Sequence, residues 1–199
     1  MIHPKTELRH VSDTVGYGVF ATEFIPEGTI VYVKDSLEID VSEEDYQRHS
    51  KPIQDIIEKY SYIDERGYRI ISWDFAKYVN HSCSCNTIST GYGFEIAIRD
   101  IQIGEQITDE YGIFNLDYEM PCECGSPSCR RAIKPSDFET YHKLWDEKIT
   151  RSLAKLKDVE QPLYSLIERN CKKELESYLN SRGRYRSIYN LRYRKAVTA

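Results

Sequence analysis

The sequence predicts a mostly β fold with some α structure, in which several small sheets precede a helical C-terminal extension. Three features support this prediction. Short β-branched or alternating segments, separated by glycine and proline turns, fill most of the chain before residue 113. A segment rich in cysteine follows them. From residue 137 onward, apolar residues recur at helical spacing.

The N-terminal segment, residues 7–33, is expected to contain three strands. A turn around Gly16 and Gly18 separates the first two strands, and a Pro26-Glu27-Gly28 turn precedes the β-branched run at 29–33. Neither Gly16 nor Gly18 carries a Cβ, so a ligand could approach this backbone closely. A plain tight hairpin accounts for the same pattern.

The middle of the chain is expected to contain short helices and strands. Residues 42–60 begin with Ser42 as a helix N-cap and acidic residues in the first turn, and Pro52 is expected to divide them into two helical pieces. The remaining elements are short, with a strand at 68–73, a turn or short helix at 74–78, alternating strands within 87–98 and a strand ending in 107–112.

Two apolar stripes at helical spacing predict helices after residue 137. The stripes consist of Leu144, Trp145, Ile149, Leu153 and Leu156, and of Leu163, Leu166, Ile167, Cys171, Leu175, Tyr178 and Leu179. Pro162 separates them, and Gly183 is expected to end the second helix. Beyond Gly183, three tyrosines at four-residue spacing predict a further basic helix.

Composition and charge limit the class of protein. The chain has 199 residues, 40% hydrophobic and 30% charged, which suits one globular domain with an appendage. It shows no membrane-spanning run and no signal pattern, so we expect an intracellular protein, or one secreted without a signal peptide. Residues 181–199 hold six basic and no acidic side chains, so the tail is +6 and the remainder −11 within a net charge of −5.

Two segments concentrate groups that bind ligands. Residues 78–86 combine polar and cysteine side chains beside an aromatic run, and an unsatisfied polar group next to a core costs roughly 1–3 kcal/mol. Cys122-x-Cys124-x4-Cys129 favours a metal, zinc above all, over disulfides in a chain without a secretory signal. Three thiolates leave one position of a tetrahedral zinc site to be supplied from elsewhere.

Together these segments resemble the SET-domain protein lysine methyltransferases with a post-SET zinc module, in the manner of small bacterial or viral members. Four signatures stand in the family's order: Gly16-Tyr17-Gly18-Val19-Phe20-Ala21, Tyr78-Val79-Asn80-His81-Ser82-Cys83, Gly104-Glu105-Gln106-Ile107-Thr108-Asp109-Glu110-Tyr111-Gly112 and Cys122-x-Cys124-Gly125-Ser126-x-x-Cys129-Arg130. The resemblance covers about residues 8–131.

The resemblance also implies a domain organisation. We expect a SET domain at 8–115 with an insert at about 42–66, in which several small sheets wrap around a pseudoknot. A post-SET zinc module at 116–135 and a helical extension with a basic tail at 136–199 would follow. In the family, the segments around Asn80–Cys83 and Tyr111 cross.

The implied activity is S-adenosylmethionine-dependent methylation of a lysine on histone or another basic protein. Such a transfer needs in-line positioning more than acid–base groups, because orientation alone can supply roughly 7–11 kcal/mol. Desolvation in an aromatic channel would help a lysine, whose ordinary pKa is about 10.4, to lose its proton. By resemblance, Tyr111 is the catalytic residue that orients the amine.

The resemblance assigns the cofactor-binding residues to three of the signatures. They are Gly16, Tyr17, Gly18, Lys77, Tyr78, Asn80, His81 and Tyr111. Lys77 stands where the family usually has arginine. Because lysine lacks the bidentate guanidinium fork, weaker affinity for the cofactor carboxylate is expected.

The resemblance also supplies the fourth zinc ligand. Cys83 is expected to complete the site with Cys122, Cys124 and Cys129, and so to hold the post-SET segment over the active site. Cys85, which replaces the family's usual proline, is an alternative ligand or a small buried residue. Cys171 is expected in a helix core.

Asp109 departs from the family pattern. The family commonly has Phe or Tyr two residues before the catalytic tyrosine, and the bulk of that residue tunes how many methyl groups are added. An acid at this position would hold the substrate amine or turn outward, so the number of methyl groups is not predicted. No pre-SET cysteine array precedes residue 8, so substrate targeting is expected from the insert, the tail or a partner.

Two other classes of function fit part of the sequence. A catalytically idle SET module would serve as a zinc-bearing scaffold, but the intact Asn80, His81 and Tyr111 count against it. A zinc-dependent nucleic-acid binder would use the basic tail, yet gives the glycine motif no role. The tail would contact nucleic acid or cover the acidic remainder of its own chain, and the C-terminal helices could form a homodimer. No membrane contact is expected, and the location is the cytoplasm or, for a chromatin-targeting effector, a host nucleus.

Overall fold

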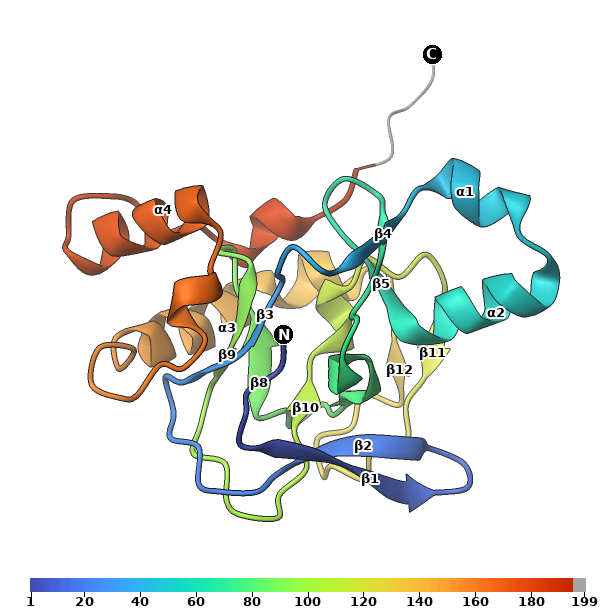
Figure 1. The fold of residues 1–199 in the computed structure, drawn as a ribbon, viewed down its shortest axis with the longest axis horizontal. Coiled ribbons are helices and arrows are strands. Elements are labelled where there is room, and N and C mark those ends of the chain that lie inside the picture. The colour runs from blue at the N-terminus through green and yellow to red at the C-terminus, as the bar shows by residue number, and fades with distance from the viewer. Residues whose placement is uncertain (195–199) are drawn as a thin grey trace.

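The computed structural model describes residues 1–194 and contains many short strands with helices at both sides (Figure 1). The helices are α1 (Glu43–Arg48), α2 (Lys51–Tyr60), α3 (Asp137–Leu153) and α4 (Arg169–Leu179), with 3-10 turns η1 (Phe75–Tyr78), η2 (Tyr111–Ile113), η3 (Tyr164–Leu166) and η4 (Ile188–Leu191). The strands are β1 (Thr6–Ser12), β2 (Gly16–Ala21), β3 (Ile30–Val33), β4 (Ile39–Val41), β5 (Ser61–Ile63), β6 (Arg69–Ile71), β7 (Asn80–His81), β8 (Thr87–Ser89), β9 (Phe94–Ala97), β10 (Thr108–Asp109), β11 (Met120–Pro121) and β12 (Ala132–Ile133). The predicted class, small sheets with some helices, is confirmed.

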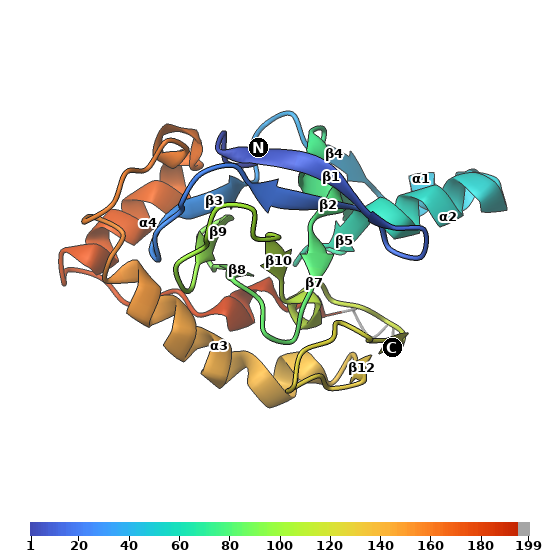
Figure 2. The same ribbon diagram turned by 90° about the horizontal axis from the view of Figure 1, so that it is seen from below.

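The strands pair into small sheets rather than one large one. Two sheets have three strands, in the orders β3-β9-β8 and β4-β6-β5, and three have two strands, β1-β2, β7-β10 and β11-β12. All pairs are antiparallel except β7-β10, which is parallel. Figure 2 shows the β3-β9-β8 sheet and the β7-β10 pair between the β1-β2 hairpin on one side and α3 on the other.

The main core lies between α3 and the β3-β9-β8 sheet. Trp145, Ile149 and Leu153, spaced four apart on one face of α3, are buried with Ile88 and Ile96 of the sheet. Leu144, which the sequence placed in the same stripe, is 48% exposed because it lies one residue off this face. A second core forms around Val19 of β2 together with Ile101 and Ile107.

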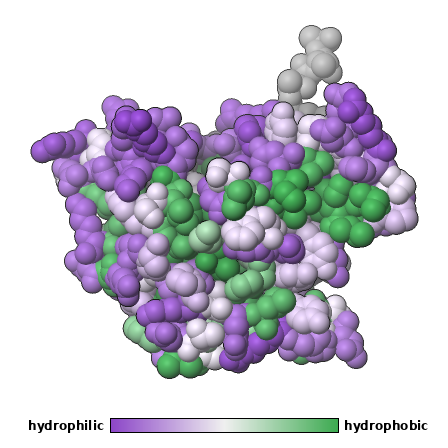
Figure 3. Space-filling view, in the orientation of Figure 1, coloured by the Kyte–Doolittle hydropathy of each residue, from purple (hydrophilic) through white to green (hydrophobic). Residues whose placement is uncertain are grey.

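Local signals at 42–60 predicted the helices correctly. Ser42 Oγ accepts the Asp45 N–H at 3.0 Å, which caps α1, and the chain leaves helix at His49 before α2 begins. Pro52 lies in the first turn of α2, where its missing N–H costs nothing. Ile53 and Ile56 of α2 are exposed. Figure 3 shows hydrophobic residues gathered on the side of the molecule where α2 lies.

The strands expected within 87–98 are confirmed as β8 and β9. All four residues of β9 are buried, because β9 is the central strand of its sheet and α3 packs on it. One prediction from pattern alone is wrong. The tail does not form a tyrosine-lined helix after Gly183, since only η4 is helical in its described part.

The described part of the tail lies against its own chain. Arg186 pairs with Glu174, and Arg192 pairs with Glu139. Tyr185 donates to Asp146 at 2.7 Å. This agrees with the expectation that the tail covers the acidic remainder of the chain, while Lys195 lies outside the described residues. Within residues 1–194, no helix is long and apolar enough to cross a membrane.

Candidate active site and metal centre

The site forms where two segments distant in the sequence run side by side. In the parallel β7-β10 pair, Asn80 lies opposite Thr108 and His81 opposite Asp109. The Ser82 N–H donates to the Asp109 carbonyl at 3.2 Å, and the Tyr111 hydroxyl donates to the Val79 carbonyl at 2.6 Å. The pairing therefore holds Tyr111 directly over the strand that carries Asn80 and His81.

Tyr111 is held between two other rings. Its ring centroid lies 5.5 Å from that of His81 and 5.1 Å from that of Phe114. Burial, together with the nearby carboxyls of Asp109 and Glu95, raises the pKa of Tyr111 above its ordinary value. Tyr111 therefore keeps its phenolic proton at neutral pH and acts as a hydrogen-bond donor, not as a base.

Two neighbouring cavities lie near Tyr111, which lines the smaller of them. The smaller, of about 290 Å³, is lined by Lys77, Val79 and Tyr111 among others. The larger, of about 620 Å³, extends from β8 and β9 to the tail. The side chains that line both cavities are Tyr32, Tyr62, Glu95 and Phe114.

The glycine motif adjoins the same strands. Asn80 Nδ2 donates to the Tyr17 carbonyl at 2.9 Å, and the rings of Tyr17 and Tyr78 meet edge to face. Gly16 has a φ of +83° and begins β2, so the turn precedes the motif. A Cβ on Gly18 would lie 2.4 Å from Gln106 Nε2, 2.9 Å from Val11 Cγ2 and 3.1 Å from Asn80 Nδ2.

With S-adenosylmethionine, the cofactor that the motif resemblance implies, as the probe, we expect Gly18→Ala to weaken binding by about tenfold, because the new methyl group displaces Asn80 and Gln106. Crowding of this kind costs roughly 1–3 kcal/mol of folding stability. Isothermal titration and thermal unfolding measure both effects. Gly104→Ala is the control: its φ of +77° makes the substitution strained, but nothing lies within 4 Å of the new Cβ. Equal binding losses in the two variants would contradict the expectation.

His81 connects the crossing strands to the cysteines. Burial, followed by the charge of Arg130, lowers the pKa of His81 to about 4, so the imidazole is neutral at physiological pH. Its Nδ1 lies 2.9 Å from the Asp109 carbonyl and 3.2 Å from the Tyr111 N–H, and its Nε2 lies 3.4 Å from Cys83 Sγ. In one neutral tautomer Nδ1–H donates to the Asp109 carbonyl, and in the other Nδ1 accepts the Tyr111 N–H while Nε2–H donates to Cys83 Sγ. A single ring nitrogen cannot do both, and the shorter contact is the one to Asp109.

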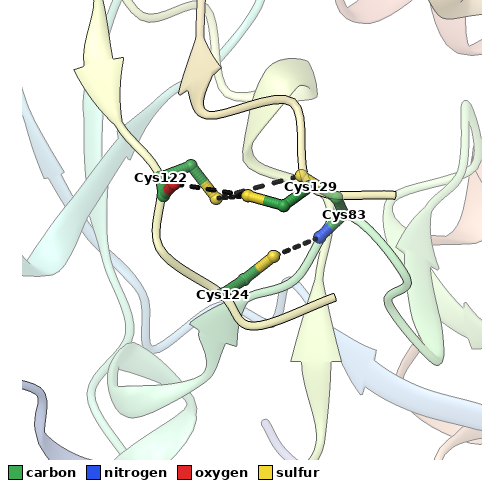
Figure 4. A group of neighbouring side chains, drawn as sticks. All are labelled: Cys83, Cys122, Cys124 and Cys129. Carbon is green, nitrogen blue, oxygen red and sulfur yellow. Dashed lines mark hydrogen bonds between the residues drawn. The ribbon is translucent and has the colours of Figure 1, made fainter. Parts of the chain in front are cut away.

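Four cysteine thiols converge below β7 (Figure 4). The Sγ atoms of Cys83, Cys122, Cys124 and Cys129 all lie within 4.8 Å of one another. Cys122 Sγ is 3.8 Å from Cys83 Sγ and 3.7 Å from Cys129 Sγ. A tetrahedral zinc with Zn–S bonds of about 2.3 Å has S–S edges of about 3.8 Å. The thiol set therefore fits zinc in both ligand type and spacing.

Backbone N–H groups surround these sulfurs. Cys124 Sγ accepts the Cys83 N–H at 3.4 Å, Cys83 Sγ the Arg130 N–H at 3.3 Å, and Cys129 Sγ the Arg131 N–H at 3.4 Å. Such donors stabilise thiolates and orient metal ligands. Cys85 is buried outside the cluster, and Cys171 is half-buried beside Arg186, so neither belongs to it.

Arg130 joins the cysteine hairpin to the active strand. Its guanidinium pairs with Glu110 at 2.5 Å and with Asp137, at the start of α3, at 3.2 Å. Glu110 in turn accepts the Gly112 N–H at 2.9 Å. The hairpin, the segment that carries Tyr111 and α3 are therefore coupled through one partly buried cation.

The structure brings the expected site residues into two adjoining groups, one around Tyr111 and Asn80 and one formed by the four cysteines. It also places at the site residues that the sequence patterns did not indicate. Glu95, Arg130, Tyr62 and Phe114 were not predicted. Glu95 was overlooked because alternation of apolar and polar residues would place it on the solvent face of β9. The available signal was an acidic residue within an otherwise apolar run.

The comparisons with known proteins agree with this architecture. Residues 16–112 match the SET domain family. Residues 16–112 are therefore a SET domain. The cysteine hairpin at 122–129 lies outside the matched segment.

Several curated relatives are similar over this region. A variant-silencing SET domain-containing protein of Plasmodium falciparum is 36% identical over 138 residues, or 59% of this chain and 5% of that protein. Histone-lysine N-methyltransferase set1 of Dictyostelium discoideum is 33% identical over 136 residues, which cover 61% of this chain and 9% of that protein. A putative histone-lysine N-methyltransferase of Arabidopsis thaliana, ASHH4, is 24% identical over 152 residues, which cover 69% of this chain and 42% of that protein. The chain thus spans less than half the length of each.

Two solved structures are also similar in fold. The methyltransferase domain of human SETMAR has a TM-score of 0.47 and 18% identity, covering 67% of this chain and 58% of that one. KRYPTONITE, in complex with mCHG DNA and SAH, has a TM-score of 0.43 and 22% identity, covering 62% of this chain and 28% of that one.

The three curated relatives come from eukaryotes, and the resemblance to small bacterial or viral members stays a prediction.

Proposed function

We propose that this chain is an S-adenosylmethionine-dependent protein lysine N-methyltransferase that acts on a histone or another basic protein. The observation that supports it most is Tyr111, whose protonated hydroxyl is anchored to Val79 beside a cavity within a SET domain. Two of the relatives carry histone-lysine N-methyltransferase names, which favours a histone substrate.

The chain's own residues would position the two substrates. S-adenosylmethionine, when bound, supplies an electrophilic methyl group. Lys77 would neutralise its carboxylate, while Asn80 and the Gly16–Gly18 backbone would hold its other groups. Tyr111 would orient the lysine amine, and Tyr62 and Phe114 would exclude water from it.

We further propose that Cys83, Cys122, Cys124 and Cys129 hold one structural zinc ion. The four thiols and their N–H donors leave no open ligand position, as in structural sites. The metal would tie the hairpin to β7 next to the active strands.

Incubation with tritiated S-adenosylmethionine and a panel of core histones, ribosomal proteins and cell lysate tests the activity. We expect label on at least one basic protein at lysine, identified by mass spectrometry. Binding of S-adenosylmethionine without label on any substrate would favour the catalytically idle scaffold. Absence of both would overturn the proposed function.

A further inference from the structure

Two buried carboxyl groups line the smaller cavity, and one of them also lines the larger. Glu95 lines both cavities, and Asp109 lines the smaller one. Their residues are 9% and 1% exposed. The same wall contains Tyr62 and Phe114, whose rings are in contact at 5.2 Å. A ligand in the smaller cavity therefore meets two carboxyls beside an aromatic wall that the larger cavity shares.

The hydrogen bonds of Asp109 leave one oxygen available. Asp109 Oδ1 accepts the Glu110 N–H at 2.8 Å. Asp109 Oδ2 is buried and accepts no N–H or hydroxyl hydrogen bond from residues 1–194. Its carboxyl interacts with that of Glu95, which is possible as a hydrogen bond only if the two share a proton. A buried oxygen without a donor is costly unless a ligand supplies one.

The charges around the pair compensate it only in part. Glu110 is neutralised by Arg130. The N-terminal ammonium of Met1, 3.5 Å from Glu38, opposes the rise that burial causes in the pKa of Glu95. Lys34, which lines the larger cavity, is paired with Asp64 at 3.2 Å. Tyr32, Tyr62 and Tyr111 contribute neutral hydroxyls, because burial raises the pKa of each. Lys77 lines the smaller cavity too and is the residue assigned to the cofactor carboxylate.

We propose that Glu95 and Asp109 form a subsite for an alkylammonium group, which receives the charged end of the substrate lysine. This proposal deepens and rests on the proposed function. A primary ammonium offers three N–H donors to the carboxyl oxygens, and its alkyl chain fits between aromatic rings. A hydrated metal ion or an anion would find no such match in an aromatic wall.

The subsite also accounts for the proton that the amine must lose. Two carboxyls that share one proton carry a single negative charge and can accept one further proton. The ammonium gives one N–H proton to the pair and becomes a neutral amine with a free electron pair. After transfer of the methyl group the product is again a cation, and the pair returns to its starting state by releasing the proton to water. One proton is released per turnover.

Binding of n-butylammonium, a mimic of the lysine side chain, tests the subsite without needing the natural substrate. We expect wild-type protein to bind n-butylammonium at least tenfold more tightly than n-butanol, measured by NMR titration at pH 7.5. Glu95→Gln and Asp109→Asn, which keep size and remove charge, are each expected to abolish this preference. Glu27→Gln is the matched control, because Glu27 is another largely buried acid, paired with Lys155, that lines neither cavity.

The outcomes separate the subsite from the enzyme. Equal binding of the amine and the alcohol by wild-type protein overturns the subsite, whether or not the variants fold. Preference that persists in both variants, or that is lost equally in Glu27→Gln, also overturns it. If wild-type protein methylates a lysine and the two variants keep its KM, the subsite fails and the function stands. If the ammonium preference is present and lost as expected but no protein is methylated, the subsite stands and the function fails.

Discussion

Replacing Tyr111 by phenylalanine should reduce the rate of lysine methylation by roughly 100-fold or more, which is the size of effect that loss of orientation at a reacting centre produces. The substitution removes only the hydroxyl, which donates to the Val79 carbonyl at 2.6 Å. The ring contacts with His81 and Phe114 remain. We therefore expect kcat to fall while binding of S-adenosylmethionine changes little. Single-turnover kinetics and titration measure the two quantities.

Tyr92→Phe is the control for this prediction. Tyr92 is fully buried, and its hydroxyl accepts the Arg186 N–H at 2.9 Å, but it lines neither cavity. Each variant loses one buried hydrogen bond, worth about 1 kcal/mol. Activity should be kept in Tyr92→Phe. The catalytic assignment fails if Tyr111→Phe retains most of its rate, or if both variants slow methylation equally.

Local signals were sufficient to predict most of the elements. Ser42 and Pro52 gave the boundaries of α1 and α2 because caps and prolines act within one turn of helix. The spacing of Trp145, Ile149 and Leu153 gave the buried face of α3. The prediction of a helix in the tail was wrong for the opposite reason. Tyr185 and its neighbours bond to Asp146 and Glu139, so tertiary contacts override their helical spacing.

The site was predictable only through motif resemblance. Spacing of Cys122, Cys124 and Cys129 indicated a metal, but no local rule relates them to Cys83, which is 39 residues away in sequence from the nearest. The resemblance supplied Cys83, and the thiol cluster contains it. Cys85 was the alternative, and its side chain is buried elsewhere.

The burial of Asp109 depends on contacts that no local pattern encodes. An acid at that position could face solvent or the substrate. The β7-β10 pairing and the central position of β9 enclose Asp109 together with Glu95, so the residue is 1% exposed and lines a cavity. No sequence pattern within either strand predicts this pairing, because it depends on which strands become neighbours.

Replacing Cys83 by serine should impair both the metal centre and the chemistry. Cys83 is the only cluster member on the β7 side, while the other three belong to the 122–129 segment. Structural zinc sites bind with roughly 10–16 kcal/mol, so loss of one of four ligands should weaken zinc by on the order of 100-fold or more. The wild-type protein should contain one zinc per chain by mass spectrometry, and the variant much less after dialysis against a mild chelator.

Catalysis should fall with the metal because the hairpin also supports the active strands. Arg130, next to Cys129, pairs with Glu110, and His81 lies 3.4 Å from Cys83 Sγ while contacting the Tyr111 N–H. Loss of zinc would release the hairpin and with it the packing around Tyr111. We expect a lower melting temperature and roughly a tenfold or greater loss of methylation, and treatment of wild-type protein with a strong chelator should reproduce both.

Two variants separate the metal from the cofactor residues. Cys85→Ala should keep one zinc per chain, because Cys85 lies outside the cluster although it is only two residues away. Asn80→Ala should also keep zinc, yet weaken binding of S-adenosylmethionine, because it removes the contact between Asn80 and the Tyr17 carbonyl. If Cys83→Ser and Asn80→Ala proved indistinguishable in zinc content, the strand from Asn80 to Cys83 would act as one unit. In that case the cysteine could not be assigned to the metal separately from the cofactor residues.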